Sequence, residues 1–219
     1  GHVRILAIET SGRAGSVCVA DGTRVLARAA LPQDMRHAGG LHVSMDQLVR
    51  DQGWSSGKVD EVYVSAGPGS FTGIRIGIAV ARTMAWATAA RLVRVPSMDA
   101  LAVNALDLDS PPAYLATALD AKRKQVFAAF FLLETDSGGL RQYRKLEDAR
   151  MVDPPAFLEE MASRYNAAGR IAVLGEGLAM HRAAAEKAGA AILPPEFWSA
   201  RAESIYRVGR QMAAAGEYC

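Results

Sequence analysis

The chain of 219 residues is half hydrophobic and 22% charged, so it can bury a sizeable core. Its formal net charge of +2 is too small to indicate nucleic-acid binding on its own, and its two cysteines exclude a disulfide framework or a cysteine-rich zinc site. No apolar run reaches membrane length and no signal peptide is recognisable, so we expect a cytoplasmic protein with no membrane partner.

The first half of the chain predicts a three-stranded opening followed by alternating helices and strands. Its strands are expected over residues 3–8, 16–20, 23–31, 60–66 and 92–95. Short polar turns join the first three, which is typical of an antiparallel meander. Apolar residues at helical spacing predict helices over residues 41–52, 72–90 and 98–106.

The polar stretch 107–112 contains two prolines and predicts a domain boundary, so we expect one lobe over 1–108 and a smaller one over 109–219. The pattern then restarts, with strands over residues 113–119, 125–133, 140–146, 171–174 and 191–193. Helices are expected over residues 154–165, 178–187 and 200–215. The fold class is therefore α/β with mixed sheets, in two related lobes.

The helix over 72–90 lacks a clear polar face, and a helix that is apolar almost all round is buried on more than one side. One of its ridges is nearly bare backbone, because small residues recur at every fourth position: Gly73, Gly77, Ala81, Ala85 and Ala89. Two interpretations stay open for this ridge. It packs densely within one domain, or it lets a helix of another chain approach closely.

A second feature is the glycine turn before this helix. It lacks the lysine of a Walker loop, and its third glycine is one position late for a dinucleotide fingerprint. A strand–turn–helix junction still presents free N–H groups to an anion, and Glu9 ends the first strand. The candidate nucleotide or anion contacts are Glu9, Thr10, Gly67, Gly69 and Ser70.

Catalytic machinery is harder to find. His37 and His42 are five residues apart, whereas two metal ligands on one helical face are four apart. There is no serine elbow, and neither Cys18 nor Cys219 has the surroundings of a nucleophile. The basic turn 122–124 is better explained as a solvated turn than as a phosphate contact. We therefore expect no catalytic residue, no metal and no cofactor.

Four stretches resemble the TsaB (YeaZ) family: ILAIETS at 5–11, AGPGSFTGIRIG at 66–77, LDAKRKQVFAAFF at 119–131 and VLGEG at 173–177. The second is the most specific, because nearly every position fits the family signature. The third departs from the family pattern D-A-R-x-x-E-V-Y, so no polar role is carried over to Gln125. The resemblance covers both lobes and implies the actin-like ATPase and sugar-kinase fold, with a mixed sheet flanked by helices in each lobe.

The resemblance also implies a function, which is threonylcarbamoylation of adenosine 37 in tRNA. In that pathway the TsaB subunit is a non-catalytic scaffold. It binds the catalytic paralogue TsaD, the ATPase TsaE docks on that pair, and tRNA is reached only through the complex; alone, the subunit pairs with a second copy. TsaD carries a metal-binding His-x-x-x-His pair, and the different histidine spacing here favours the scaffold. The alternative is an ATP-binding phosphotransferase or hydrolase of the same fold.

In the TsaB family the first-lobe helices form the pairing surface, and they correspond here to residues 41–52 and 72–90. The expected partner-binding residues combine one face of the first helix with the small-residue ridge of the second: Leu41, Met45, Leu48, Gly73, Gly77, Ala81 and Ala85. A bulky change such as Ala81→Trp is expected to prevent pairing and to leave the fold intact.

Overall fold

The computed structural model describes residues 2–31, 38–55 and 58–219. The chain divides into two compact units, which are residues 1–100 with 200–219 (unit 1) and residues 101–199 (unit 2). The boundary predicted from the sequence, between 108 and 109, assigned the whole C-terminal half to the second lobe. The structure differs because the last helix, α6 (Ala202–Ala214), packs on the sheet of unit 1.

Unit 1 is built on a five-stranded mixed sheet in the order β3-β2-β1-β4-β5. Its strands are β1 (Arg4–Glu9), β2 (Gly15–Asp21), β3 (Arg24–Leu31), β4 (Glu61–Ser65) and β5 (Arg91–Val95). The first three form the predicted antiparallel meander, and the β2–β3 turn contains Gly22 at a φ of 56°. β4 and β5 run parallel to β1, which lies at the centre and is almost wholly buried.

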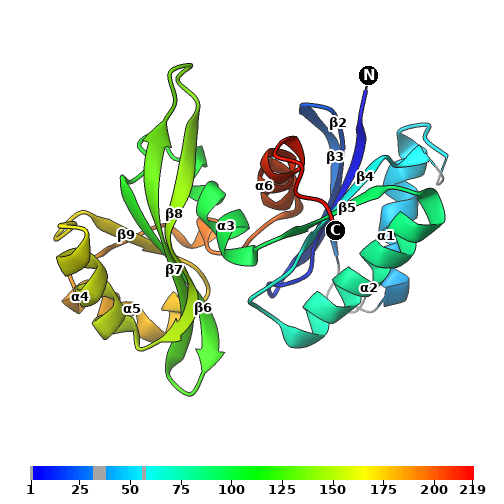
Figure 1. Cartoon of the computed structure of the whole chain (residues 1–219). Coiled ribbons are helices and arrows are strands. Elements are labelled where there is room, and N and C mark those ends of the chain that lie inside the picture. Colours follow the sequence, from blue (N-terminus) through cyan, green and yellow to red (C-terminus); the bar gives the residue numbers. More distant parts are fainter. Residues whose placement is uncertain (1, 32–37, 56–57) are drawn as a thin grey trace. The chain divides into compact units, whose positions relative to one another are not determined.

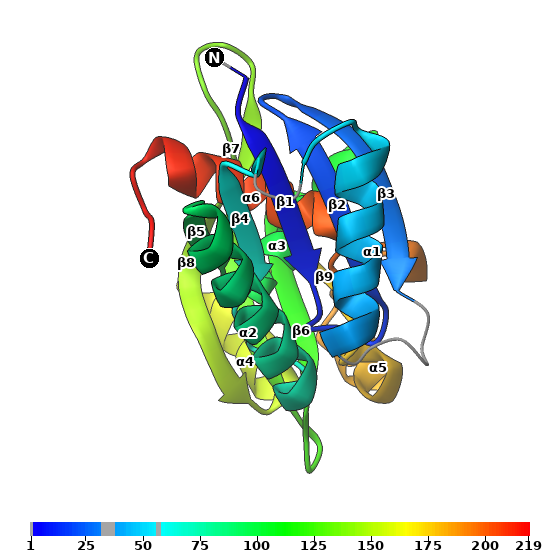
Figure 2. The ribbon, with the colours of Figure 1, turned by 90° about the vertical axis from the view of Figure 1, so that its right-hand side faces the viewer.

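Helices cover both faces of this sheet. α1 (Ala38–Asp51) and α2 (Phe71–Thr88) lie side by side on one face, and α6 lies on the other (Figures 1 and 2). α6 is held by hydrogen bonds at two points: the Ala202 amide donates to Ser16 Oγ at 2.9 Å, and the Tyr206 hydroxyl donates to the Gly22 carbonyl at 2.9 Å. A sheet covered on both faces needs apolar residues on both, which explains the continuous apolar run of β1.

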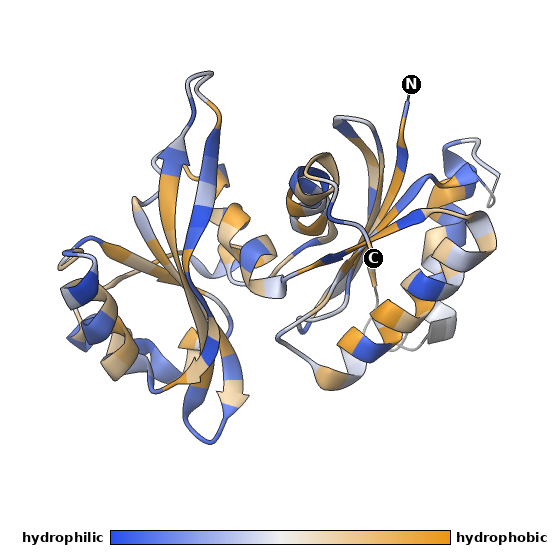
Figure 3. Cartoon of the chain, in the orientation of Figure 1, coloured by the Kyte–Doolittle hydropathy of each residue, from blue (hydrophilic) through white to orange (hydrophobic). Residues whose placement is uncertain are grey.

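Unit 2 contains a second five-stranded sheet, in the order β10-β9-β6-β7-β8. Its strands are β6 (Tyr114–Lys122), β7 (Gln125–Thr135), β8 (Arg141–Val152), β9 (Ile171–Leu174) and β10 (Ala191–Ile192). β6, β7 and β8 form an antiparallel meander, and β9 and β10 run parallel to β6. Two helices, α4 (Pro154–Arg164) and α5 (Leu178–Lys187), pack on the sheet, and hydrophobic residues are concentrated in the strands (Figure 3).

The two sheets repeat one plan, as the sequence predicts. Ile5–Ile8 of β1 pair in parallel with Glu61–Val64 of β4, just as Tyr114–Thr117 of β6 pair with Ile171–Leu174 of β9. In each unit a helix follows the second of these strands and leads to the last strand. The two units therefore share the arrangement of their strands, although the two sequences show no repeat.

The largest differences from the predicted elements are at two places. The helix expected over 98–106 is split into α3 (Ser97–Ala102) and a tighter 3-10 turn, η3 (Val103–Asp107). In that turn the Asn104 amide donates to the carbonyls of Phe197 and Ser199, at 3.0 and 2.8 Å. The strand expected over 140–146 continues to Val152, since β8 is an edge strand and an edge tolerates charged residues that hide the apolar alternation.

In the VLGEG stretch, glycine is required at position 175 because two backbone segments approach closely there. Gly175, directly after β9, has a φ of 127°, which is open to glycine at low cost. A Cβ atom there would lie 2.1 Å from the carbonyl oxygen of Ala118 in β6. Gly177 then donates its N–H to the same carbonyl at 3.0 Å, so the turn into α5 is packed directly against β6.

Candidate protein-interaction face

The small-residue ridge of α2 is occupied by the chain itself. A Cβ atom at Gly73 would lie 2.0 Å from the carbonyl oxygen of Thr10, and one at Gly77 would lie 2.2 Å from Thr10 Oγ1. Gly77 and Ala81 are buried, while Gly73 and Ala85 are half-buried. The ridge therefore lets α2 approach the residue that follows β1, which corrects its interpretation as a seat for another chain.

The predicted contact residues of α1 also point inward. Leu41, Met45 and Leu48 are buried in the hydrophobic core between α1 and the sheet. Ala81 has no exposed surface either, so Ala81→Trp would disrupt the packing of unit 1 and could not test pairing alone. Pairing through α1 and α2 stays a prediction, and it now concerns the outward residues of the same two helices.

Three large hydrophobic side chains are exposed on α1 and α2. Phe71 and Trp86 of α2 are 74% and 87% exposed, and Val43 of α1 is 58% exposed. Within the described part of unit 1, these are the large hydrophobic side chains that are exposed. Large apolar side chains exposed on the helical layer of one unit are candidates for a surface that another molecule covers.

The same side of α2 is positively charged. Arg75 and Arg82 are exposed, and residues 71–88 contain no Asp or Glu. The Arg75 guanidinium carbon lies 5.2 Å from the centre of the Phe71 ring, a cation–π arrangement. Tryptophan and arginine are enriched among the residues that dominate the binding energy of interfaces. We call these residues the outer face: Val43, Phe71, Arg75, Arg82 and Trp86.

Glu9 lies at the end of β1 and is fully buried. Its Oε1 accepts hydrogen bonds from the Ser11 amide, from Ser11 Oγ at 2.6 Å and from the Gly12 amide at 3.1 Å. Its Oε2 has no hydrogen-bond partner among the described residues. Burial raises the pKa of this carboxyl, and the hydrogen bonds from Ser11 and Gly12 oppose the rise.

The other predicted anion contacts lie around the start of α2. Ser70 caps this helix, accepting from the Gly73 amide at 3.2 Å, and its own amide donates to the Ser11 carbonyl at 2.8 Å. Thr10 and Ser70 line one cavity of about 210 Å³, whereas Glu9 and the glycines 67 and 69 are not part of its lining. The structure thus brings two of the five residues to one cavity. Nucleotide or anion binding there stays a prediction.

In 2–31, 38–55 and 58–219, no three or more His, Cys, Asp and Glu side chains gather as they would around a metal ion. His42 is an exposed residue of α1, and His37 lies outside the described residues. Across the same ranges, no helix combines the length and apolarity that a bilayer crossing requires.

Reasoning from the sequence missed the outer face, although a signal for it exists. Positions 71, 75, 82 and 86 fall on one side of an α-helix, at spacings of four, seven and four residues. Because α2 is apolar almost all round, this stripe is not visible as an amphipathic pattern. The tertiary structure was needed to show which apolar side chains meet the sheet and which do not.

The amino-acid sequence is similar to a family model and to curated proteins of tRNA modification. A family model described as TsaD: tRNA N6-adenosine threonylcarbamoyltransferase matches residues 24–210. The tRNA threonylcarbamoyladenosine biosynthesis protein TsaB of Bacillus subtilis (strain 168) is 27% identical over 156 residues, which span 71% of this chain and 66% of that protein. The protein of the same name from Escherichia coli (strain K12) is 26% identical over 216 residues, covering 98% of this chain and 89% of the relative. The resemblance seen in the sequence motifs is confirmed.

Solved structures confirm the fold. YeaZ from Pseudomonas aeruginosa superposes with a TM-score of 0.78 at 24% identity, covering 99% of this chain and 95% of that one. A ROK hexokinase from Thermus thermophilus superposes with a TM-score of 0.52 at 12% identity, covering 98% and 100%. The predicted actin-like ATPase and sugar-kinase fold, with a mixed sheet in each unit, is therefore confirmed.

Proposed function

Because the chain belongs to the family described as TsaD: tRNA N6-adenosine threonylcarbamoyltransferase, we propose that it acts in tRNA threonylcarbamoyladenosine biosynthesis as an accessory subunit. In this role it pairs through the outer face with a catalytic TsaD-like subunit, and a TsaE-like ATPase docks on the pair. The tRNA is reached through the complex, in the cytoplasm. The names of the TsaB relatives from Bacillus subtilis and Escherichia coli support the pathway.

One observation carries the proposed pairing. Phe71 and Trp86 are exposed at opposite ends of the same helix, with two arginines between them and no acidic residue on that helix. Keeping such side chains in water has no benefit for the folded chain, whereas burying Trp86 against a partner removes a large apolar area from water. The free chain pairs with a second copy through the same face.

The accessory role is supported by the histidines. The catalytic paralogue is characterised by two histidines four residues apart, while His37 and His42 are separated by five. On a helix, a spacing of four places two imidazoles on one face and a spacing of five does not. The chemistry of threonylcarbamoyl transfer is therefore assigned to the partner.

The experiment uses Trp86→Glu, which places a charge on the outer face without touching the core. Loss of a tryptophan that acts as a hot spot of an interface costs about 2 kcal/mol or more, so the dissociation constant for the TsaD-like subunit should rise about 30-fold. Met180→Glu is the matched control, since Met180 is 71% exposed but lies on unit 2. Affinity is measured by calorimetric titration with both subunits purified.

Activity is followed in the same series by mass spectrometry of threonylcarbamoyladenosine in tRNA, with TsaD-like and TsaE-like subunits and a threonylcarbamoyl donor present. Trp86→Glu should lower the yield, and Met180→Glu should leave it unchanged. Equal modification with and without this chain would remove the accessory role. Full activity of Trp86→Glu together with unchanged affinity would show that pairing uses another surface.

A further inference from the structure

The turn between β6 and β7 of unit 2 consists of three consecutive basic residues, Lys122, Arg123 and Lys124. All three are exposed, and they lie at the tip of a hairpin that projects beyond the helices α4 and α5 of the same unit (Figures 1 and 2). The sequence alone favours a solvated turn. The backbone gives a different interpretation, because the residue types of this turn conflict with its conformation.

All three residues have a positive φ, of 69° at Lys122, 51° at Arg123 and 65° at Lys124. Lys122 pairs with Gln125 across the hairpin, so Arg123 and Lys124 are the two central residues of the turn. Positive φ at both central residues is characteristic of a type I′ turn, in which asparagine, aspartate and glycine are the usual residues. Glycine enters this region at low cost, whereas a residue with a Cβ atom is disfavoured there.

Two other hairpins of the molecule do use glycine. The β2–β3 turn has Gly22 at a φ of 56°, and the β7–β8 turn has Gly139 at a φ of 83°. Five non-glycine residues have a positive φ in the part of the chain that the structure describes, and three of them form this one basic turn. Strained backbone in native proteins is concentrated at functional sites. The turn therefore retains three basic side chains at a cost to the stability of the fold.

The charges of this turn are only partly neutralised. Asp120 accepts hydrogen bonds from the Lys122 amide at 2.8 Å and from Lys122 Nζ at 2.9 Å. The side chains of Arg123 and Lys124 form no hydrogen bond or ion pair with the described residues. Elsewhere in unit 2, exposed arginines pair with carboxylates: Arg144 with Glu134, Arg150 with Glu160 and Arg164 with Glu147. The tip of the hairpin thus presents two adjacent positive charges to an anionic partner.

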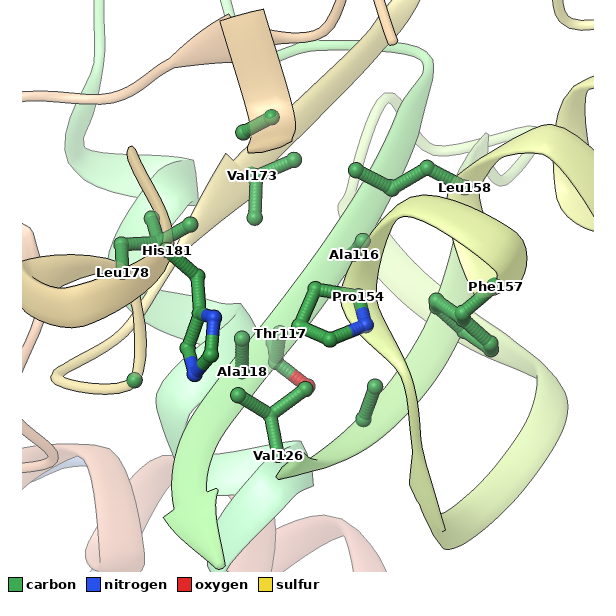
Figure 4. A pocket seen from close by; sticks show the side chains of 13 residues that line it. Ala116, Thr117, Ala118, Val126, Pro154, Phe157, Leu158, Val173, Leu178 and His181 are labelled. Carbon is green, nitrogen blue, oxygen red and sulfur yellow. The ribbon is translucent and has the colours of Figure 1, made fainter. Parts of the chain in front are cut away.

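The cavity beside the strands of this hairpin does not suit the same kind of ligand. It lies between the sheet and the helices α4 and α5, has a volume of about 20 Å³ and is lined mainly by apolar side chains, among them Val126, Phe157 and Leu178 (Figure 4). A charge without a partner is strongly disfavoured in such surroundings. Recognition of an anion by unit 2 is therefore expected at the exposed tip of the hairpin.

We propose that the turn 122–124 contacts the phosphate backbone of tRNA when this chain is part of the complex. The inference rests on the proposed function, in which the complex modifies tRNA. Arginine binds a phosphate through two parallel hydrogen bonds, and lysine binds it as a compact charge. Such contacts position the nucleic acid without reading its sequence. The formal net charge of the chain is only +2, so the turn adds to tRNA binding by the complex and does not replace it.

The test uses Arg123→Asn with Lys124→Gly, which gives the turn its usual residues and removes both unpaired charges. Affinity for an unmodified tRNA transcript is measured by fluorescence anisotropy at several salt concentrations, with this chain in complex with the TsaD-like and TsaE-like subunits. We expect the dissociation constant to rise about tenfold, and the slope of its logarithm against that of the salt concentration to shrink by about one to two. Unchanged affinity and slope, with pairing intact, would overturn this inference alone.

The same variant should be more stable than the parent chain, because asparagine and glycine accept a positive φ. We expect its melting temperature to rise by about 2–4 °C. A rise in stability together with a loss of tRNA affinity would support the proposal that the basic residues serve recognition. A lower melting temperature would contradict the cost to stability from which the proposal starts.

Arg141→Gln with Lys187→Gln is the matched control, since it removes two exposed charges of unit 2 outside the turn. An equal loss of tRNA affinity in both double variants would assign the effect to net charge and overturn the site. Calorimetric titration with the TsaD-like subunit should show unchanged pairing for the turn variant. Weaker pairing with unchanged tRNA affinity would assign the turn to an acidic protein surface, and a parent chain that does not pair at all would overturn the proposed function together with this inference.

Discussion

The two units share one topology but use their helices differently. α2 of unit 1 has 18 residues, begins with the side-chain cap of Ser70 and exposes Phe71 and Trp86. α5 of unit 2 occupies the equivalent place with 10 residues, has no side-chain cap and is kinked at His181. The sheets have kept the same strand order, so the divergence of the two units is concentrated in the helical layer.

This difference has a physical reason. A central strand such as β1 or β6 is constrained by neighbours on both edges and both faces, and any change there is felt by the whole unit. The outward side of a helix has no such neighbours and is free to acquire aromatic residues and charge. The functional difference between the units is therefore expected on the helices, and a set of variants can test each part of that comparison.

The largest effect is expected for Gly77→Val, which should destabilise unit 1 by about 3 kcal/mol. A side chain at this position meets Thr10 Oγ1 and Val64, and neither can retreat from a close-packed core. Chemical denaturation followed by circular dichroism measures the change. Ala79→Val is the control, because Ala79 is exposed on the same helix and carries the same β-branched cost. Equal losses for the two variants would contradict the close approach of α2 to β1.

A double charge reversal on α2, Arg75→Glu with Arg82→Glu, should weaken pairing with the TsaD-like subunit about tenfold, or about 1.4 kcal/mol. The affinity of the parent chain should fall with increasing salt, and that of the variant should not. Surface plasmon resonance at two salt concentrations measures both.

The matched control reverses the same number of charges on unit 2, through Arg123→Glu with Arg141→Glu. These arginines are exposed and lie away from α1 and α2 in the chain. If the two double variants weaken pairing equally, the effect comes from net charge and not from the outer face.

Glu9→Gln should stabilise the chain at neutral pH by about 1 kcal/mol, the lower end of the cost of an unsatisfied buried group. Burial raises the pKa of Glu9, so the folded chain holds this proton more tightly than the unfolded chain does. The stability that results is complete below the ordinary glutamate pKa and is lost as the pH rises through the raised value. The advantage of glutamine should therefore shrink toward about pH 4.

Denaturation at several pH values measures this prediction, with Glu61→Gln as a control of opposite sign. The buried Glu61 carboxylate accepts hydrogen bonds from Tyr63, Arg91 and Tyr218, so its neutralisation should destabilise the chain at neutral pH. A Glu9→Gln variant less stable than the parent at neutral pH would show that Oε2 is satisfied in solution.

The smallest effect concerns the cap that distinguishes the two helices. Ser70→Ala should cost about 0.5–1 kcal/mol, since the Gly73 amide loses its acceptor at the start of α2. Thr72→Ala removes a neighbouring exposed hydroxyl that caps nothing and should change the free energy of unfolding very little. Indistinguishable denaturation curves for Ser70→Ala and the parent would mean that α2 does not depend on its cap.

Most of the fold follows from the sequence alone. Strand and helix positions were predictable because apolar spacing and the glycine turns are local signals, and the repeated meander and the family motifs indicated the mixed sheet in each unit. The return of α6 to the first sheet was not predictable. It depends on contacts such as Tyr206 with Gly22, between residues far apart in the chain.

The inward and outward sides of α2 were decided by tertiary structure, for a related reason. When nearly every position of a helix is apolar, periodicity does not show which side faces the sheet. Thr10 lies directly against Gly73 and Gly77, so this side of α2 faces the end of β1. Phe71 and Trp86 lie on the other side of the helix and remain in water. Composition predicted burial of this helix on several sides, whereas the structure buries only Gly77 and Ala81 of α2. The position of Thr10, over sixty residues earlier, determined which side meets the sheet and which stays open.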